Sequence, residues 1–351
     1  MTSLTTSPAT SPGTSPTSPT VRRGPAGLLR EVVRRPSAGV VGLLVLICAV
    51  MTFLAPSFLT YGNWYNLAQQ MVFVALLAIG MTIVLITGGI DLSVGSVLGL
   101  SAGVMAYLVN QGMMFGLCLL LAVAAGAALG LVNGLVVTKL GIPDFVATLA
   151  MLGVAGGLLY LWTGGVPFTG FMIPVYDTLG GVTPLVGDLT APILAMAVIA
   201  VVVAFIMRRT SFGRHAYGVG GNREAARLSG VDVGRVRVTA YVLSGTLAAC
   251  AGVLLAGRTT AVAPTIGVGY EIQAIAAAVI GGAALAGGRG RVLGAVLGAL
   301  TLTVASNVIN LASVSPTWQP VAVGTILLVA VGLDRASASL SRRLGRAAPS
   351  R

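Results

Sequence analysis

The stretch from residue 67 to residue 109 reads LAQQMVFVALLAIGMTIVLITGGIDLSVGSVLGLSAGVMAYLV, two apolar runs separated by the motif TGGIDLS at residues 87–93. Each run is long enough to cross the apolar core of a bilayer as a helix, and the paired glycines would end the first helix. Asp91 is the only charged residue in the stretch. The stretch from residue 67 to residue 109 therefore predicts two membrane-spanning helices joined by a short polar break.

Comparable runs recur along the whole chain. Of its 351 residues, 56% are hydrophobic and only 9% are charged, and the mean hydropathy is +0.95. Soluble domains carry about 25% charged residues, so the composition excludes a soluble enzyme, a secreted scaffold and a disordered protein. We predict an all-α fold, a polytopic membrane helix bundle of about ten transmembrane helices near residues 40–55, 67–87, 92–109, 113–137, 145–162, 190–207, 238–257, 272–286, 292–311 and 318–333.

The chain divides into a membrane domain and two tails. Residues 1–39 are rich in Ser, Thr and Pro and then basic, which predicts a disordered tail. Residues 40–335 form the transmembrane domain with a long basic loop at 208–237, and residues 336–351 form a second basic tail. Paired arginines before the first run are typical of signal peptides, but no small-residue cleavage site follows, so we expect an uncleaved first span.

The basic residues indicate the orientation. With ten crossings and an internal amino terminus, 20 of the 21 lysines and arginines fall on one side, Arg258 being the exception. Basic loops stay in the cytoplasm, so both termini are predicted to be cytoplasmic and the protein to be a multi-pass protein of the cell membrane. Trp64, Trp162 and Trp318 fall at the outer ends of spans. The basic residues lie between the apolar runs and do not gather on one face of a folded domain, which argues against nucleic acid as a partner.

Residues for covalent catalysis are scarce. His215 is the only histidine and Lys139 the only lysine, and Lys139 does not stand in the Gly-Lys-Ser/Thr pattern of a phosphate-binding loop. We therefore predict no catalytic residues, no metal site and no cofactor bound by this chain. If ATP drives transport, another polypeptide must bind the ATP and its Mg²⁺.

Polar side chains inside the spans are the candidates for a translocation path. Asp91 could cap the helix that follows the break, which we favour, or could bind a proton or a solute. Neutral amides and hydroxyls suit a polyhydroxylated solute, although each one alone could simply join helices. The candidate residues are Gln69, Gln70, Asp91, Asn133, Thr148, Gln273, Ser306, Asn307 and Asn310.

Small residues repeat at four-residue spacing in three spans. Such ladders let helix backbones approach closely, and we favour packing within one chain over a dimer seam. The ladders are Gly95, Gly99 and Gly103; Gly126, Gly130 and Gly134; and Gly294 and Gly298.

The loop at 208–237 contains the sequence NREAARLSG at residues 222–230. Asn222 can cap a short helix and Gly230 can end it. The helix could transmit force from a docked partner, or the loop could be a solvated basic segment that only fixes orientation.

Three motifs in this order resemble the permease subunits of ribose-type monosaccharide ABC importers, within a larger group that also carries branched-chain amino acids and nucleosides. They are GMT at 80–82 through TGGIDLSVGS at 87–96, GGN at 220–222 through SG at 229–230, and GYE at 269–271 through GGRG at 287–290. The resemblance covers roughly residues 40–335 and departs from the family at Gln273, at Gly156 and at Ser306–Asn307, which puts the identity of the sugar in question.

The resemblance implies a homodimer of permeases in the lipid membrane, a cytoplasmic ABC ATPase and an extracellular substrate-binding protein that delivers the sugar. Carried over by position, the helix that seats in the ATPase would be Asn222, Arg223, Glu224, Ala225, Ala226, Arg227, Leu228, Ser229 and Gly230, and the outer loop 163–189 would help to receive the binding protein. A permease for a nucleoside or a branched-chain amino acid is the nearest alternative. An autonomous ion-coupled transporter is disfavoured because no carboxylate is predicted at the membrane centre.

Overall fold

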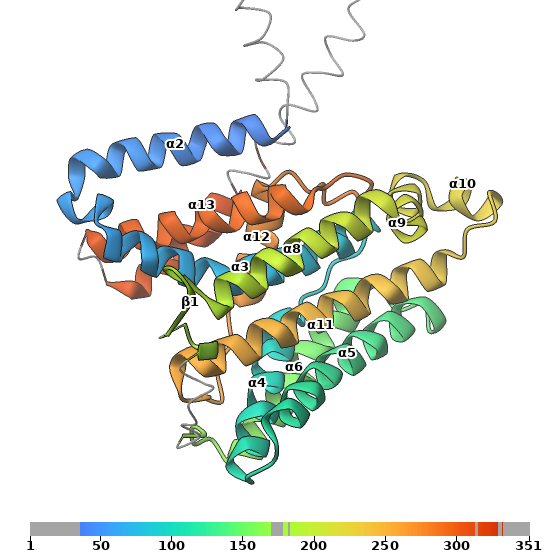
Figure 1. Cartoon of the computed structure of the whole chain (residues 1–351). Helices are drawn as coiled ribbons and strands as arrows, with labels where there is room; N and C mark the ends of the chain where they lie inside the picture. Colours follow the sequence, from blue (N-terminus) through green and yellow to red (C-terminus); the bar gives the residue numbers. More distant parts are fainter. Residues whose placement is uncertain (1–35, 170–177, 182, 313–314, 329–331, 333–351) are drawn as a thin grey trace, which may run out of the picture.

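A computed structural model describes residues 36–169, 178–181, 183–312, 315–328 and 332. Residues 1–35 of the first predicted tail and the whole of the second, 336–351, lie outside these residues, as does part of the outer loop 163–189. The described part is a bundle of helices that run roughly side by side (Figure 1). The helices are α2 (Pro36–Leu54), α3 (Tyr61–Ile86), α4 (Val94–Asn110), α5 (Phe115–Lys139), α6 (Asp144–Thr163), α8 (Ala191–Arg209), α9 (Ser211–Gly221), α10 (Arg223–Leu228), α11 (Val233–Thr259), α12 (Tyr270–Ile280) and α13 (Val292–Leu311).

Short elements complete the chain. The 3₁₀ turns η1 (Pro56–Leu59) and η2 (Pro316–Trp318) follow α2 and α13, and a further apolar helix covers Gln319–Leu328. The strands β1 (Pro184–Val186) and β2 (Leu189–Thr190) form an antiparallel hairpin, the one sheet among the described residues and a departure from the predicted all-α fold.

Every predicted span coincides with a helix. Six helices, α3, α5, α6, α8, α11 and α13, are long and apolar enough to cross a membrane. The other four predicted spans fall on the shorter apolar helices Val40–Leu54, Val94–Asn110, Tyr270–Ile280 and Gln319–Leu328. The protein is therefore a multi-pass membrane protein.

Helix boundaries differ from the prediction where capping residues outweigh hydropathy. Helix α3 begins at Tyr61 instead of residue 67, because the Thr60 side chain accepts a hydrogen bond from the Asn63 amide. Helix α12 ends at Ile280, six residues before the predicted end of its span, because Gly281 and Gly282 follow and Gly282 has a φ of 90°.

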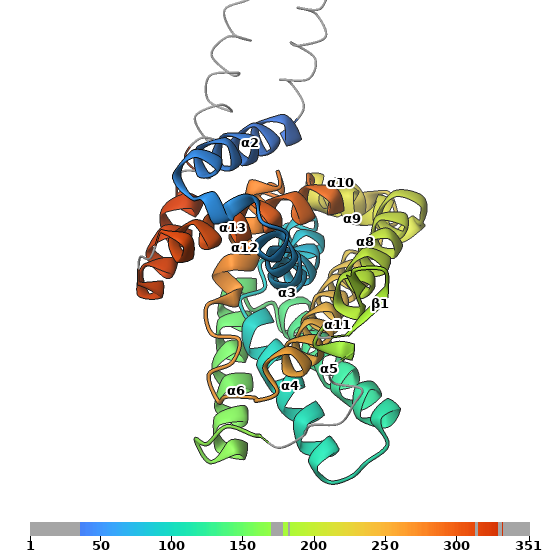
Figure 2. The same cartoon turned by 60° about the vertical axis from the view of Figure 1, so that its left-hand side comes forward.

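Helix α3 occupies the centre of the bundle, between α12 and α13 on one side and α8 and α11 on the other (Figure 2). In its most apolar 18-residue window, 89% of the residues are buried, against 22% in α5, α6 and α8. The peripheral helices expose apolar side chains such as Phe53, Val201 and Phe205. This outer apolar surface is what a bilayer would cover.

The glycine ladders pack inside the chain, as predicted. A Cβ on Gly126, Gly130 or Gly134 of α5 would meet α11 at Gly245, Tyr241 or Val238, respectively. The ladder of α4 lies against residues 266–267 and Leu159, and that of α13 lies against Ala277 of α12 and Gly281, which follows α12. Close backbone approach therefore holds α4, α5, α11, α12 and α13 together.

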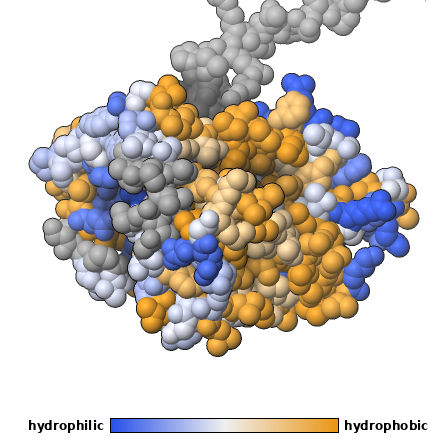
Figure 3. Space-filling model, turned by 60° about the horizontal axis from the view of Figure 1, so that its bottom comes forward, coloured by the Kyte–Doolittle hydropathy of each residue, from blue (hydrophilic) through white to orange (hydrophobic). Residues whose placement is uncertain are grey.

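The described basic residues, apart from Arg258, gather at one end of the bundle, where α8 ends, α9 and α10 lie and α11 begins. Trp64, Trp162 and Trp318 are at the opposite end, near the first turn of α3, the last turn of α6 and η2. Hydrophobic residues cover the middle of the molecular face, and hydrophilic residues lie toward both ends (Figure 3). We call the basic end, with α9 and α10, the loop end.

Candidate functional site

The break between α3 and α4 is the best-connected polar feature of the described structure. Helix α3 ends at Ile86, and its C-cap residue Thr87 is followed by Gly88, whose φ is 74°. Gly88 N–H donates to Leu85 O, and Gly89 N–H donates to Val84 O. This pair of bonds is a Schellman motif, which needs a residue in the left-handed conformation and so favours glycine. The chain then passes through Asp91 before α4 begins at Val94.

Asp91 is buried, with 1% of its surface exposed, and its carboxylate accepts three hydrogen bonds. Ser93 donates to Oδ1 from its backbone N–H at 3.1 Å and from its hydroxyl at 2.6 Å. The Ser244 hydroxyl of α11 donates to Oδ2 at 2.8 Å. Burial of a carboxylate is costly, and these neutral donors offset part of that cost. The residue before Val94, Ser93, is the N-cap of α4, and no side chain caps this helix by a hydrogen bond. Asp91 therefore holds a turn just before α4 and does not cap the helix, contrary to the role favoured from the sequence.

The position of Asp91 within the bundle differs from the prediction. The sequence predicts Asp91 at the end of a span, a position that argues against ion coupling. Its partner Ser244 lies eleven residues after Val233, where α11 begins, which is about 16 Å along the helix axis. The break therefore lies inside the bundle, because α4 is a short helix of 17 residues that starts at that depth. Position alone no longer argues against a proton or ion role.

Two further predicted path residues lie at the same break. Asn133 of α5 donates from Nδ2 to the Ser93 hydroxyl at 2.8 Å. The Thr148 hydroxyl of α6 lies 2.8 Å from the Asp144 carbonyl and 3.4 Å from the Ile90 carbonyl. Asp91, Asn133 and Thr148 thus come together from three segments, with Ser244 from a fourth.

A buried ion pair flanks the break. Arg237 of α11 lies 3.2 Å from Asp144 at the start of α6, and their side chains are 10% and 24% exposed. A Cβ on Gly89 would lie 2.8 Å from the Tyr241 hydroxyl and 3.1 Å from the Asp144 carboxylate. Tyr241 also donates to Ile90 O at 3.3 Å. The break is therefore packed against charged and polar groups of α6 and α11, with no room for a side chain at residue 89.

The remaining predicted path residues lie elsewhere. Gln69 donates to Gly181 O at 2.8 Å, and Asn307 exchanges hydrogen bonds with Asn63 at 2.8 and 3.2 Å. Ser306 is buried beside Asn307 on α13, whereas Gln70 and Asn310 are exposed. Gln69 thus ties α3 to the outer loop and Asn307 ties α13 to α3, and none of these residues joins the cluster at the break.

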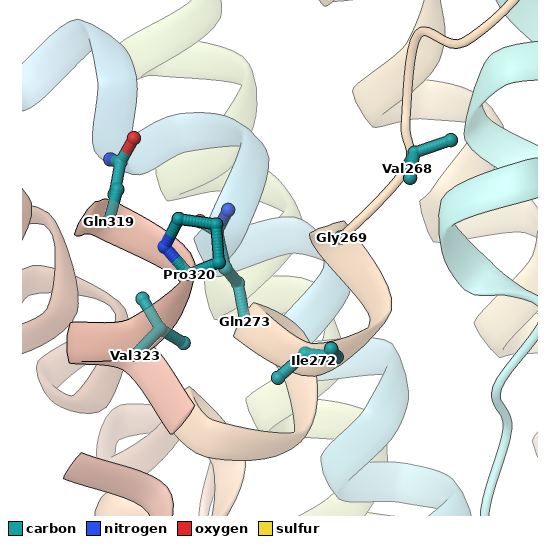
Figure 4. Close-up of a pocket in the computed structure, with 7 residues that line it drawn as sticks. All are labelled: Val268, Gly269, Ile272, Gln273, Gln319, Pro320 and Val323. Atoms are coloured by element: carbon teal, nitrogen blue, oxygen red, sulfur yellow. The ribbon is translucent and has the colours of Figure 1, made fainter. Parts of the chain in front are cut away.

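Gln273 lines a surface pocket between α12 and the helix Gln319–Leu328. Its other walls are Val268, Gly269, Ile272, Gln319, Pro320 and Val323. Figure 4 shows the two glutamines on different helices, with Ile272 and Val323 among the apolar walls. Sequence reasoning missed Gln319, although an amide within an apolar run is the signal that singled out Gln273. It also missed Ser244, since a lone serine in a span carries no distinguishing signal.

Helix α10 has the predicted caps. Asn222 Oδ1 accepts from the Ala225 N–H at 3.0 Å. At the other end Gly230 has a φ of 81° and donates to Arg227 O. Ala226 is buried against the bundle, whereas Leu228 is 78% exposed. The helix therefore presents most of its surface outward at the loop end.

Arg223, the first residue of α10, contacts the break directly. Its Nη2 donates to Gly88 O at 2.7 Å, a bond between positions 135 residues apart. Among the described residues, no group of three or more His, Cys, Asp or Glu side chains could hold a metal ion.

Comparison with known proteins places this arrangement among permeases. Residues 63–331 match the sequence model of the family described as branched-chain amino acid transport system / permease component. The chain is 39% identical to the ribose import permease of Escherichia coli (strain K12) over 297 residues, 84% of this chain and 92% of that protein. It is 40% identical to the ribose import permease of Bacillus subtilis (strain 168) over 294 residues, 84% and 91% of the two chains. A xylose transport permease of Haemophilus influenzae is 46% identical over 143 residues, 41% and 38% of the two chains.

Proposed function

This chain belongs to the family of branched-chain amino acid transport system permease components, and we propose that it is the membrane-spanning subunit of an ATP-driven importer for a monosaccharide of the ribose, xylose or galactose kind. The observation that carries the proposal is the likeness to ribose import permeases over more than nine-tenths of their length. The buried amides and hydroxyls of the spans suit a neutral, hydroxyl-rich solute.

Energy would come from a separate cytoplasmic ATPase, which would hold ATP and Mg²⁺. Helix α10 supports this arrangement, because it is capped at both ends and presents an exposed outer surface at the loop end. An extracellular binding protein would deliver the sugar to the opposite end, where the hairpin β1–β2 and the neighbouring loop lie. Nucleotide-driven movement of α10 would then alternate access between the two ends.

The orientation proposed is ten crossings with both termini in the cytoplasm. The concentration of arginines at the loop end supports it, since cytoplasmic segments carry an excess of basic residues. The three tryptophans at the other end fit the headgroup level of the outer leaflet.

Two copies of the chain would form the path. The pocket with Gln273 and Gln319 supports this, because it opens on the outside of the bundle beside Val268, which is 76% exposed. Amide groups facing lipid would lack hydrogen-bond partners, whereas a second copy and a passing sugar would supply them.

The test is uptake by purified protein in liposomes, with its ATPase and binding protein. We expect uptake of radiolabelled ribose, xylose or galactose that depends on ATP. Uptake of leucine or a nucleoside in place of sugars would favour the alternative substrates of this family. Uptake under an ion gradient with the ATPase absent would overturn the proposal and assign Asp91 to ion coupling.

A further inference from the structure

Helix α3 ends in a position where a cation is favoured. Its 26 residues direct their carbonyls toward Gly88, so partial negative charge accumulates there. The Schellman bonds use the carbonyls of Val84 and Leu85 but leave that of Gly88 for another donor. The guanidinium of Arg223 occupies this place, with Nη2 2.7 Å from Gly88 O.

A second contact joins the end of α3 to α9 through their backbones. Gly220 near the end of α9 has no room for a Cβ, because Ile86 O and Gly288 N lie against it. Gly288 N–H donates to Ile86 O at 3.0 Å, so the loop between α12 and α13 joins the contact. Burial raises the pKa of Tyr217, whose protonated hydroxyl donates to Gly290 O at 2.8 Å. We call the contact of Ile86, Gly220 and Gly288 the glycine joint.

The joint and the arginine make two points of attachment on the end of α3. The joint fixes α9 against Ile86, and Arg223 fixes α10 against Gly88, two residues further along the chain. A displacement of α10 about the joint would therefore move Gly88. Asp91 follows three residues later and is bonded to α11 through Ser244, so the movement would reach the buried cluster at the break.

Resting on the proposed function, we propose that Arg223 is the positioning residue that transmits the movement of α10 to the break between α3 and α4, through its bond to the Gly88 carbonyl. Other arginines near it lack such a bond to the break. Arg227 pairs with Glu224 on α10 itself, and Arg235 pairs with Asp232 in the first turn of α11. Arg223 thus holds the membrane helices, whereas the rest of α10 is free to engage a partner.

The experiment compares Arg223→Ala, Arg223→Lys and the control Arg235→Ala in the complete transporter in liposomes. The readout is sugar transported per ATP hydrolysed, together with co-purification of the ATPase. Arg223→Ala should lower this ratio about tenfold while the ATPase stays bound, the scale expected for loss of one charge-assisted hydrogen bond. Arg223→Lys should recover part of the ratio, because an ammonium can also bond helix-terminal carbonyls. Arg235→Ala should match the wild type.

Hydrogen exchange on the full-length permease in detergent tests the same bond without transport. Amides of residues 88–93 should exchange about tenfold faster in Arg223→Ala than in the wild type or Arg235→Ala. Unchanged exchange, an unchanged ratio, or a loss confined to ATPase binding would each overturn the role of Arg223. Absence of ATP-driven uptake by the wild type would instead refute the proposed function, and the exchange result would still decide the role of Arg223.

Discussion

The Asp91 side chain makes both a local turn with Ser93 and a long-range bond with Ser244. Replacement by Ala would leave three donors without their acceptor, the hydroxyl protons of Ser93 and Ser244 and the Ser93 amide, at about 1–3 kcal/mol for each buried donor left unpaired. Asn keeps an oxygen for Ser93, and its amide can donate to the Ser244 hydroxyl. We therefore expect Asp91→Ala to lower the thermal unfolding temperature in detergent strongly and Asp91→Asn to lower it little, with uptake retained in Asp91→Asn. Loss of uptake in a stable Asp91→Asn protein would show that the negative charge itself is required.

A double-mutant cycle separates the Asp91–Ser244 hydrogen bond from the other hydrogen bonds of Asp91. Asp91→Ala and Ser244→Ala should each lower the free energy of unfolding. The double variant should lower it by about 0.5–3 kcal/mol less than the sum of the two single losses. Strict additivity would contradict a direct bond between these residues. The sequence favours a helix-capping role for Asp91, whereas in the structure Asp91 bonds to Ser93, the N-cap residue itself, and α4 has no side-chain cap. The sequence could not predict Ser244, which is 153 residues away.

Among the elements, α5 and α11 are held by the ladder at Gly126, Gly130 and Gly134. A Cβ on Gly130 would overlap the Tyr241 carbonyl, so Gly130→Ala should force the helices apart and destabilise the protein by about 1–3 kcal/mol. The control is Gly153→Ala on α6, where nothing lies within 4 Å of the added carbon and stability should be unchanged or higher by up to about 1 kcal/mol. Unfolding in a denaturing detergent series measures both. A Gly130→Ala protein of normal stability but altered oligomeric state would show that the ladder is a dimer seam.

Helix positions followed from the sequence, but their ends did not. Apolar length alone located the six helices that are long enough to cross a membrane and the four shorter apolar helices. Ends depend on single residues such as Asp232, which caps α11 so that the helix begins at Val233, five residues before the predicted span. Which polar side chains share a site depends on how helices pack, and the pattern of a single span does not contain that information.

For the whole molecule, the strongest asymmetry is that of charge. Segments on the loop end carry the described arginines apart from Arg258, so this end should remain in the cytoplasm.

The prediction is tested by single cysteines in a protein whose Cys48, Cys118 and Cys250 are replaced by Ala. Val186→Cys in β1 should react with a membrane-impermeant maleimide added to intact cells, because this residue is 66% exposed at the opposite end. His215→Cys in exposed α9 should react only after the cells are permeabilised. Labelling of residue 215 in intact cells, with residue 186 protected until permeabilisation, would show that the orientation is the reverse of the one predicted. Helix α10 would then lie outside the cell, out of reach of any cytoplasmic ATPase.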